Sequence, residues 1–135
     1  MLDHVSLRVA DYERSKNFYI AALAPLGYTL AMEATSGAGF RKGFIPDFWI
    51  KQGETLHAGT ASEPPEPGCG GPAIHVAFSG DDRASVDAFH RAAVAAGGRD
   101  NGAPGLRPNY HPNYYGAFVL DPDGYNIEVV CHKAQ

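Results

Sequence analysis

Cysteine is scarce in this sequence of 135 residues, which contains only Cys69 and Cys131. Two widely separated cysteines make none of the closely spaced pairs that bind structural zinc, and they are too few for a disulfide framework. A cysteine-based zinc module and a disulfide-rich secreted scaffold are therefore excluded. Because the sequence begins directly with a strand-like pattern and shows no export signal, we expect both thiols to stay reduced in the cytoplasm.

Long apolar runs and runs of basic residues are also missing. Charged residues make up 19% of the chain, and 11 basic against 15 acidic residues give a formal net charge of −4. Without a basic run, the surface offers little attraction to nucleic acid or to an anionic membrane. No segment is apolar enough to span a bilayer. We therefore expect no nucleic-acid partner and no membrane, and a small molecule as the substrate.

The second half of the sequence repeats the first in one register. The matched residues are His4 and His75, Asp11 and Asp82, Phe18 and Phe89, and Gly27 and Gly98. This agreement favours an internal duplication of one supersecondary unit. Hydrophobic residues reach 44%, an ordinary globular value, so the chain can bury the core of one domain or of two small modules that share it.

Each copy begins with a strand and continues into a helix. Apolar and polar residues alternate over 5–9 and 74–78, as in a strand with one buried face. Asp11 in the first copy, and Asp81 or Asp82 in the second, are suitable helix N-caps, and glycine follows both apolar helical stripes. Shorter strand-like runs follow at about 29–34, 39–45, 47–52, 115–120 and 125–131.

Two segments lack a regular pattern. Residues 59–72, GTASEPPEPGCGGP, hold four prolines and four glycines and are predicted to link a first module, about 1–58, to a second, about 73–135. Residues 99–116 are predicted to form a long loop rich in tyrosine, with Arg107 and His111. Long loops inside compact domains are more often functional than not.

Three residues are predicted to share one side of the fold. The repeated histidine, His4 or His75, lies on the strand face opposite the apolar residues that belong against the helix. Glu128 likewise lies opposite the core residues of the last strand, and an ionised carboxylate there must be exposed, paired or bound to a metal. Two imidazoles and one carboxylate form a ligand set for a divalent transition metal with open positions. We therefore predict that His4, His75 and Glu128 bind a metal.

Each of these residues alone also fits a solvated or hydrogen-bonded position, and it is the duplication and the shared face that favour ligation. Three further histidines fit a metal site less well. His57 lies near the linker, His90 in the second helix and His132 at the end of the last strand, so we interpret all three as surface residues.

The segments DHVSLRVADYERSKNFY, IHVAF and AFVLDPDGYNIEVV resemble the glyoxalase/bleomycin-resistance/extradiol-dioxygenase superfamily, the vicinal oxygen chelate fold. The resemblance covers nearly the whole chain. It implies an α+β fold in which two tandem βαβββ modules form a curled, incomplete barrel around the active site. It also implies metal ligands in the first strand of each module and in the last strand, where His4, His75 and Glu128 stand.

Glyoxalase I itself has a fourth protein ligand, an acidic residue in the last strand of the first module. In the corresponding stretch, PDFWIKQGE, this chain offers Phe48, Trp49 and Ile50 instead. The three-ligand set is similar to that of the fosfomycin-modifying enzymes and the extradiol dioxygenases. It does not distinguish Mn²⁺, Fe²⁺, Zn²⁺, Ni²⁺ or Co²⁺ as the cofactor.

The pocket walls are expected from the same strand faces and from the loop at 107–115. The predicted substrate-binding residues are Ser6, Arg8, Trp49, Arg107, Tyr110 and Tyr115. Arg107 suits a substrate carboxylate or phosphonate. His111, which titrates near neutrality, is the predicted catalytic acid or base, and Tyr110, Tyr114 and Tyr115 are the other candidate acids and bases. Ordinary roles also fit: core packing for Trp49, a solvated surface for Arg107, and a packed aromatic loop for the tyrosines.

The favoured function is a metal-dependent, glyoxalase-like lyase or isomerase, related to lactoylglutathione lyase, that acts on a small oxygen-chelating metabolite. A fosfomycin-type thiol transferase and an Fe(II) extradiol dioxygenase are the enzymatic alternatives. A bleomycin-resistance-like binding protein would need none of the three ligand residues, and no specific feature indicates a small regulatory dimer. Because paired modules in this superfamily often come from two chains, we also expect a homodimer.

Overall fold

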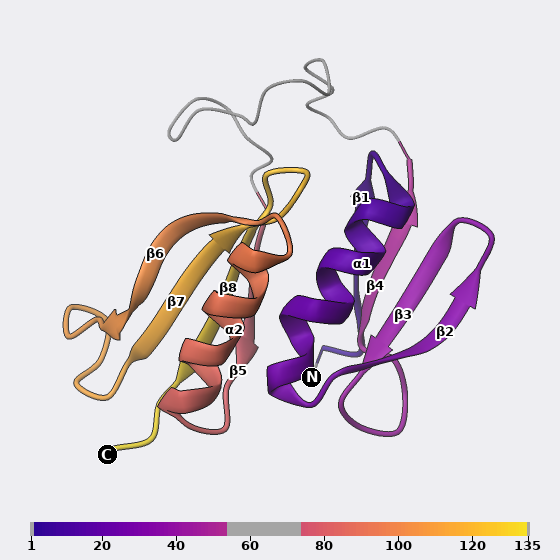
Figure 1. The fold of residues 1–135 in the computed structure, drawn as a ribbon. Coiled ribbons are helices and arrows are strands. Elements are labelled where there is room, and N and C mark those ends of the chain that lie inside the picture. Colours follow the sequence, from indigo (N-terminus) through magenta and orange to yellow (C-terminus); the bar gives the residue numbers. More distant parts are fainter. Residues whose placement is uncertain (1, 54–73, 135) are drawn as a thin grey trace.

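The computed structural model of the chain describes residues 2–53 and 74–134, which fold into two modules of the same design (Figure 1). The first contains β1 (Val5–Val9), α1 (Tyr12–Leu23), a short 3-10 helix η1 (Ala24–Leu26), β2 (Thr29–Ala34), β3 (Gly37–Arg41) and β4 (Phe48–Gln52). The second contains β5 (His75–Ser79), α2 (Arg83–Ala95), β6 (Arg99–Leu106), β7 (Tyr115–Leu120) and β8 (Asn126–Cys131). The predicted α+β fold of two tandem βαβββ modules is confirmed, and the predicted linker at 59–72 lies outside the described residues.

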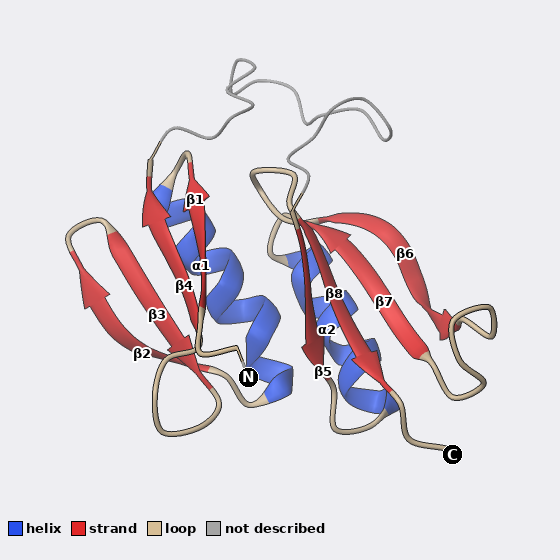
Figure 2. Cartoon of the chain, turned by 180° about the vertical axis from the view of Figure 1, so that it is seen from behind, coloured by secondary structure: helices blue, strands red, loops and turns tan. Residues whose placement is uncertain are grey.

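Each module forms its own four-stranded sheet, in the order β1-β4-β3-β2 or β5-β8-β7-β6. The first strand of a module pairs in parallel with its last strand, and the other neighbours are antiparallel. Seen from behind, the two sheets lie side by side with both helices on one side of them (Figure 2). Each sheet therefore has one face against a helix and an opposite face, called the open face below, that no helix or strand of the described residues covers.

Acidic residues cap both helices, as the sequence predicts. The Asp11 carboxylate accepts a hydrogen bond of 3.0 Å from the backbone N–H of Arg14, and the Asp82 carboxylate accepts one of 2.7 Å from that of Ser85. Ser85 accepts in return from the backbone N–H of Asp82, which completes a capping box. Neither helix of the described residues is long and apolar enough to cross a membrane.

The irregular segment 99–116 differs from the prediction, because residues 99–106 form β6 rather than the start of a long loop. This strand pairs with β7 but slips register between Asp100 and Gly102 and again between Gly102 and Gly105. Glycine and proline within RDNGAPGL hide the strand from pattern reasoning, since both residues are depleted in regular strands. The run predicted at 39–45 is likewise shorter and earlier, as β3, and residues 42–47 connect it to β4.

The two modules share a core that aromatic residues dominate. Phe78 of β5 packs edge-on against Phe48 of β4, with ring centroids 5.2 Å apart, and against Tyr28, 5.4 Å away. Helix α1 also packs against α2. A Cβ at Gly98 would lie 2.8 Å from the Phe18 ring of α1, so that glycine permits a close approach of the two modules. Apolar packing therefore contributes a large part of the interface between the modules.

Candidate metal and substrate site

The structure brings His75 and Glu128 together on the open face of the second sheet. Strands β5 and β8 are parallel neighbours in which His75 lies opposite Asn126 and Ala77 opposite Glu128. The two side chains reach diagonally across this ladder, and His75 Nε2 lies 2.8 Å from Glu128 Oε2. The shared face that sequence alternation predicts for these two residues is therefore confirmed.

Glu128 is almost inaccessible although it lies on an open face. It is 2% exposed, whereas the side chain of His75 is 48% exposed. The Tyr114 hydroxyl donates a hydrogen bond to Glu128 Oε1, and Phe118 is the residue directly opposite Glu128 on β7. A Cβ at Gly116 would lie 3.1 Å from Oε1, so this glycine leaves room for the carboxylate. Neighbouring side chains thus cover the carboxylate and leave the imidazole accessible.

Tyr114 fixes the direction of this carboxylate. Burial, and then the hydrogen bond to Glu128, raise the pKa of Tyr114 to about 12, so its hydroxyl stays protonated and donates at neutral pH. One carboxylate oxygen is thereby assigned to the phenol, and the other points at the His75 imidazole. Hydrogen bonding of this kind orients the carboxylate ligands of metal centres.

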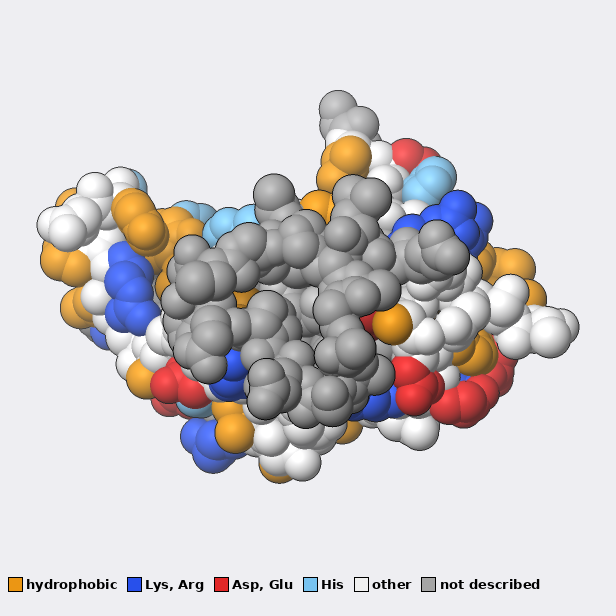
Figure 3. Space-filling view, turned by 90° about the horizontal axis from the view of Figure 1, so that it is seen from above, with side chains coloured by type: hydrophobic (Ala, Val, Ile, Leu, Met, Phe, Trp, Pro, Cys, Tyr) orange, Lys and Arg blue, Asp and Glu red, His pale blue; other side chains and the backbone are white. Residues whose placement is uncertain are grey.

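His4 lies apart from this pair. It precedes β1, is exposed, and its Nδ1 lies 2.6 Å from Asp3 Oδ1. It borders a hollow of about 400 Å³ on the open face of the first sheet, whose other lining residues are Asp3, Ser6, Ile45, Pro46, Trp49 and Lys51. Seen from above, histidine side chains are visible on both halves of the molecule (Figure 3). Within residues 2–53 and 74–134, no group of three or more His, Cys, Asp or Glu is arranged to hold a metal ion.

The donor set that does assemble fits a divalent transition metal in its chemistry. An imidazole nitrogen and a carboxylate oxygen are ligands that Mn²⁺, Fe²⁺, Zn²⁺, Ni²⁺ and Co²⁺ all accept. A buried carboxylate would also gain from a bound cation beside it, since burial makes an uncompensated anion costly. The pair is therefore two thirds of the predicted ligand set, with His4 still to be supplied.

The predicted substrate-binding residues separate into two groups. Ser6, Arg8 and Trp49 lie on the open face of the first sheet, where Ser6 is directly opposite Trp49. The Trp49 ring lies across Gly39, where a Cβ would come within 2.8 Å of it. Arg107 lies at the second sheet, with its guanidinium carbon 5.7 Å from the centroid of Phe118.

Contrary to the prediction from the sequence, the tyrosines of the loop at 107–115 and His111 do not all line one wall of the pocket. The Tyr115 hydroxyl donates to Asp87 of α2, at 2.8 Å, so this ring lies on the helix-covered face and not beside His75. Tyr110 is exposed and packs on Tyr114, with ring centroids 5.1 Å apart. His111 is exposed, and its Nδ1 accepts a hydrogen bond of 3.1 Å from the backbone N–H of Asn113.

The other histidines behave in different ways. His90 Nε2 lies 2.9 Å from Asp100 Oδ1, and His132 is exposed with its ring 6.2 Å from that of His111. His57 lies outside the described residues. Sequence reasoning missed Phe118, although the period of two that places Glu128 on the open face also places its neighbour there.

A sequence model of the Glyoxalase/Bleomycin resistance protein/Dioxygenase superfamily matches residues 1–129. The comparison with curated proteins gave no match. A solved glyoxalase/bleomycin resistance protein from Albidiferax ferrireducens T118 is 29% identical, with a TM-score of 0.72 over 97% of this chain and 98% of that one. A family enzyme from Burkholderia phytofirmans PsJN is 18% identical, with a TM-score of 0.70 and 98% of each chain covered.

The fosfomycin resistance protein FosX from Mesorhizobium loti shares the fold as well. It is 21% identical, with a TM-score of 0.67 over 98% of this chain and 92% of that one. The family match spans nearly the whole sequence, and these structures repeat the two-module architecture described above. The chain belongs to the Glyoxalase/Bleomycin resistance protein/Dioxygenase superfamily.

Proposed function

We propose that the protein is a metal-dependent, glyoxalase-like lyase or isomerase that acts on a small metabolite with adjacent oxygen atoms. The observation that supports this function best is the His75–Glu128 pair. Its carboxylate is 2% exposed and lies on a sheet face that no helix or strand of residues 2–53 and 74–134 covers. A protein that only sequestered a small molecule would need no buried carboxylate there, because desolvating an ion is costly.

The residues of the chain would each do a defined part of the work. His75 and Glu128 would hold the ion, which when bound supplies Lewis-acid stabilisation of negative charge on the substrate. Tyr114 would keep the Glu128 carboxylate oriented through its hydrogen bond. Trp49 would offer an apolar wall for the substrate, and His111 remains the predicted proton carrier.

We propose further that His4 reaches the site from a second copy of the chain in a homodimer. Two features support this arrangement. His4 stands apart from the His75–Glu128 pair within one chain, and each sheet presents an open face that carries part of the ligand set. A C2 dimer would apply the first sheet of one copy to the second sheet of the other, twice.

Mixed dimers test the shared site directly. Co-expressed His4→Ala and Glu128→Ala chains, each with a different tag that binds no metal, can be purified as heterodimers. If the site is shared between chains, one of the two sites in each heterodimer keeps all three ligands. We then expect about one metal ion per heterodimer and almost none in either parent homodimer. Heterodimers as empty of metal as the parents, or a chain that sediments as a monomer with full metal content, would contradict the proposal.

The reaction class is tested by turnover without oxygen. Protein reconstituted with Mn²⁺, Ni²⁺ or Zn²⁺ is expected to convert 2-oxoaldehydes or their thiol adducts under anaerobic conditions, and removal of the metal by a chelator is expected to stop it. Absolute dependence on Fe²⁺ and dioxygen with a catechol would identify a dioxygenase instead. Opening of an epoxide by a thiol would identify the transferase.

A further inference from the structure

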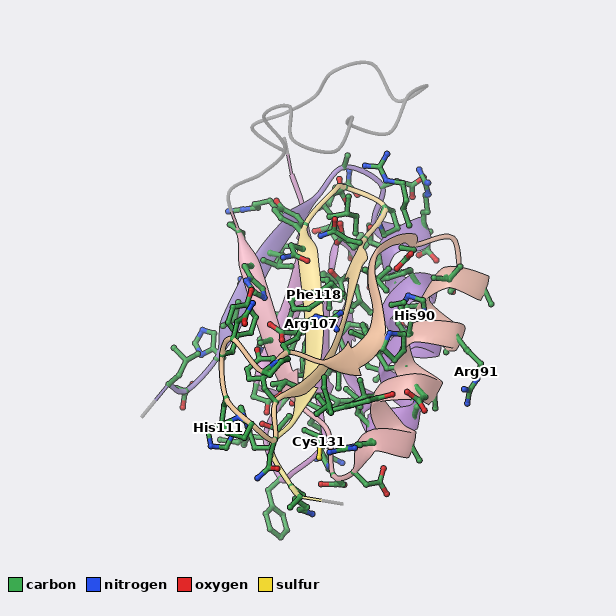
Figure 4. The ribbon with its side chains drawn as sticks, turned by 90° about the vertical axis from the view of Figure 1, so that its left-hand side faces the viewer. His90, Arg91, Arg107, His111, Phe118 and Cys131 are labelled. Atoms are coloured by element: carbon green, nitrogen blue, oxygen red, sulfur yellow. The ribbon has the colours of Figure 1, made fainter. Side chains whose placement is uncertain are left out.

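Arg107 and Phe118 form a fixed cation–ring pair on the open face of the second sheet. The Arg107 guanidinium donates to the carbonyl of Ala103, at 2.7 Å, and to that of Leu106, at 3.3 Å. Its carbon lies 5.7 Å from the Phe118 centroid, and Figure 4 shows the two residues together, away from the helix that carries His90 and Arg91. Because a guanidinium has five N–H donors, several remain for a ligand after these two bonds.

Two glycines of β6 leave the space that this pair occupies. Gly102 lies opposite Phe118 in the ladder, and a Cβ there would come within 2.9 Å of the Phe118 ring. A Cβ at Gly105 would lie 3.0 Å from Arg107 Nη1. Gly102 also has a φ of +152°, which side-chain-bearing residues rarely adopt. The irregular strand is thus shaped around the ring and the guanidinium.

The pair lies next to the proposed metal ligands. Phe118 is directly opposite Glu128 on β7, and its ring centroid is 6.1 Å from that of His75. In the part of the chain that the structure describes, no carboxylate forms an ion pair with Arg107. A half-buried cation held in place without a counter-ion favours an anionic ligand, because charge-assisted bonds from a fixed guanidinium to carboxylate or phosphate are among the strongest hydrogen bonds.

We propose that Arg107, mounted on Phe118, selects substrates that carry a carboxylate, phosphonate or phosphate group next to the atoms that bind the metal. This inference rests on the proposed function, because it assigns the substrate class of the same site. With Arg107 at one end, a pocket that binds oxygen-rich metabolites in general would prefer those that carry an anionic group at that end. Arg107 would therefore determine specificity rather than take part in bond making.

The test compares two probes of equal size that differ in charge, lactate and its neutral amide, lactamide. Binding is followed by NMR titration of the metal-free and the Zn²⁺-loaded protein. We expect the wild type to bind lactate about tenfold more tightly than lactamide, and Arg107→Gln to lose this preference while lactamide binding stays unchanged. Gly105→Ala keeps the charge but displaces the guanidinium, so it is expected to reduce the preference too. Arg91→Ala, at an exposed arginine of α2, is the matched control and should behave as wild type.

The two halves of the design separate this inference from the proposed function. Tighter binding of both probes on Zn²⁺ loading reports the metal site, whereas the lactate preference in the metal-free protein reports Arg107. An equal preference for lactate in the wild type and in folded Arg107→Gln protein would overturn the inference, whatever Zn²⁺ does. If Arg107→Gln loses the preference for lactate while Zn²⁺ changes the binding of neither probe to the wild type, the result would support the inference and refute the metal site. Thermal unfolding and the amide spectrum of each variant establish that it is folded.

Discussion

Protein carrying Glu128→Ala is expected to lose its divalent metal, with an affinity at least about 100-fold below that of the wild type. The variant removes the one anionic donor of the predicted set, and the accessible imidazole of His75 remains without its partner. Metal content is measured by elemental analysis after purification without chelators and without a metal-binding tag. Anaerobic turnover is expected to disappear together with the metal.

Two further variants make this result specific. Tyr114→Phe keeps both ligands but removes the hydrogen bond to Glu128, so we expect a smaller loss of affinity, about 10-fold. Glu33→Ala is the matched control, because Glu33 is an exposed carboxylate of β2 that pairs with Lys16 at 2.6 Å, and it should keep its metal. Undiminished metal content in Glu128→Ala would reject the site assignment.

The architecture could be predicted because its determinants are local. Alternation of apolar residues, an aspartate at each helix start and the repeat itself are visible over a few residues at a time. Strand β6 was not predicted, because its glycines interrupt the strand pattern. Gly102 and Gly105 leave room for the Phe118 ring and the Arg107 guanidinium. The irregular register of β6 follows from contacts with side chains of other segments, which no local pattern encodes.

The part of the candidate site that could be predicted is the part that depends only on which face of a strand a residue occupies. Alternation places His75 and Glu128 on the same face, and the ladder between β5 and β8 brings them into contact. His4 directly precedes the first strand of the other sheet, apart from this pair, and the alternation that assigns the face of a strand residue does not say which residues of another sheet lie near it. Tyr115 shows a further limit: YGAFVL is apolar on both faces, and the alternation therefore could not assign its ring to the helix side.

The turn before β8 carries a second testable feature, a carboxylate buried between the modules. Asp121 is 5% exposed, and its Oδ2 accepts a hydrogen bond of 2.5 Å from the hydroxyl of Tyr19 in the first module. Its Oδ1 accepts from the backbone N–H groups of Asp123 and Tyr125. Asp123 in turn accepts from the Ser15 hydroxyl, at 3.1 Å. This turn is therefore a buried polar link between the two modules.

Burial raises the pKa of Asp121 to about 7, against the opposing effect of the Tyr19 hydrogen bond. Between the ordinary carboxyl pKa near 4 and this value, the folded protein holds a proton that the unfolded chain has released. By linkage, this group's contribution to the free energy of unfolding is full below pH 4 and falls as the pH rises to 7. The loss amounts to about 4 kcal/mol, since the window spans about three pH units and each is worth about 1.4 kcal/mol at most.

Asp121→Asn is therefore expected to flatten the pH dependence of stability between pH 4 and 7, as measured by urea unfolding of the metal-free protein. Tyr19→Phe removes the bond that favours the ionised form, so its fall in stability should extend to higher pH. Asp81→Asn, at an exposed aspartate whose partner Lys42 lowers its pKa, is the control and should keep the slope of the wild type over this window. A slope in Asp121→Asn equal to that of the wild type would show that Asp121 is ionised throughout. The tie between the modules would then be an ordinary charged hydrogen bond, insensitive to pH near neutrality, and Tyr19→Phe would lower stability equally at every pH tested.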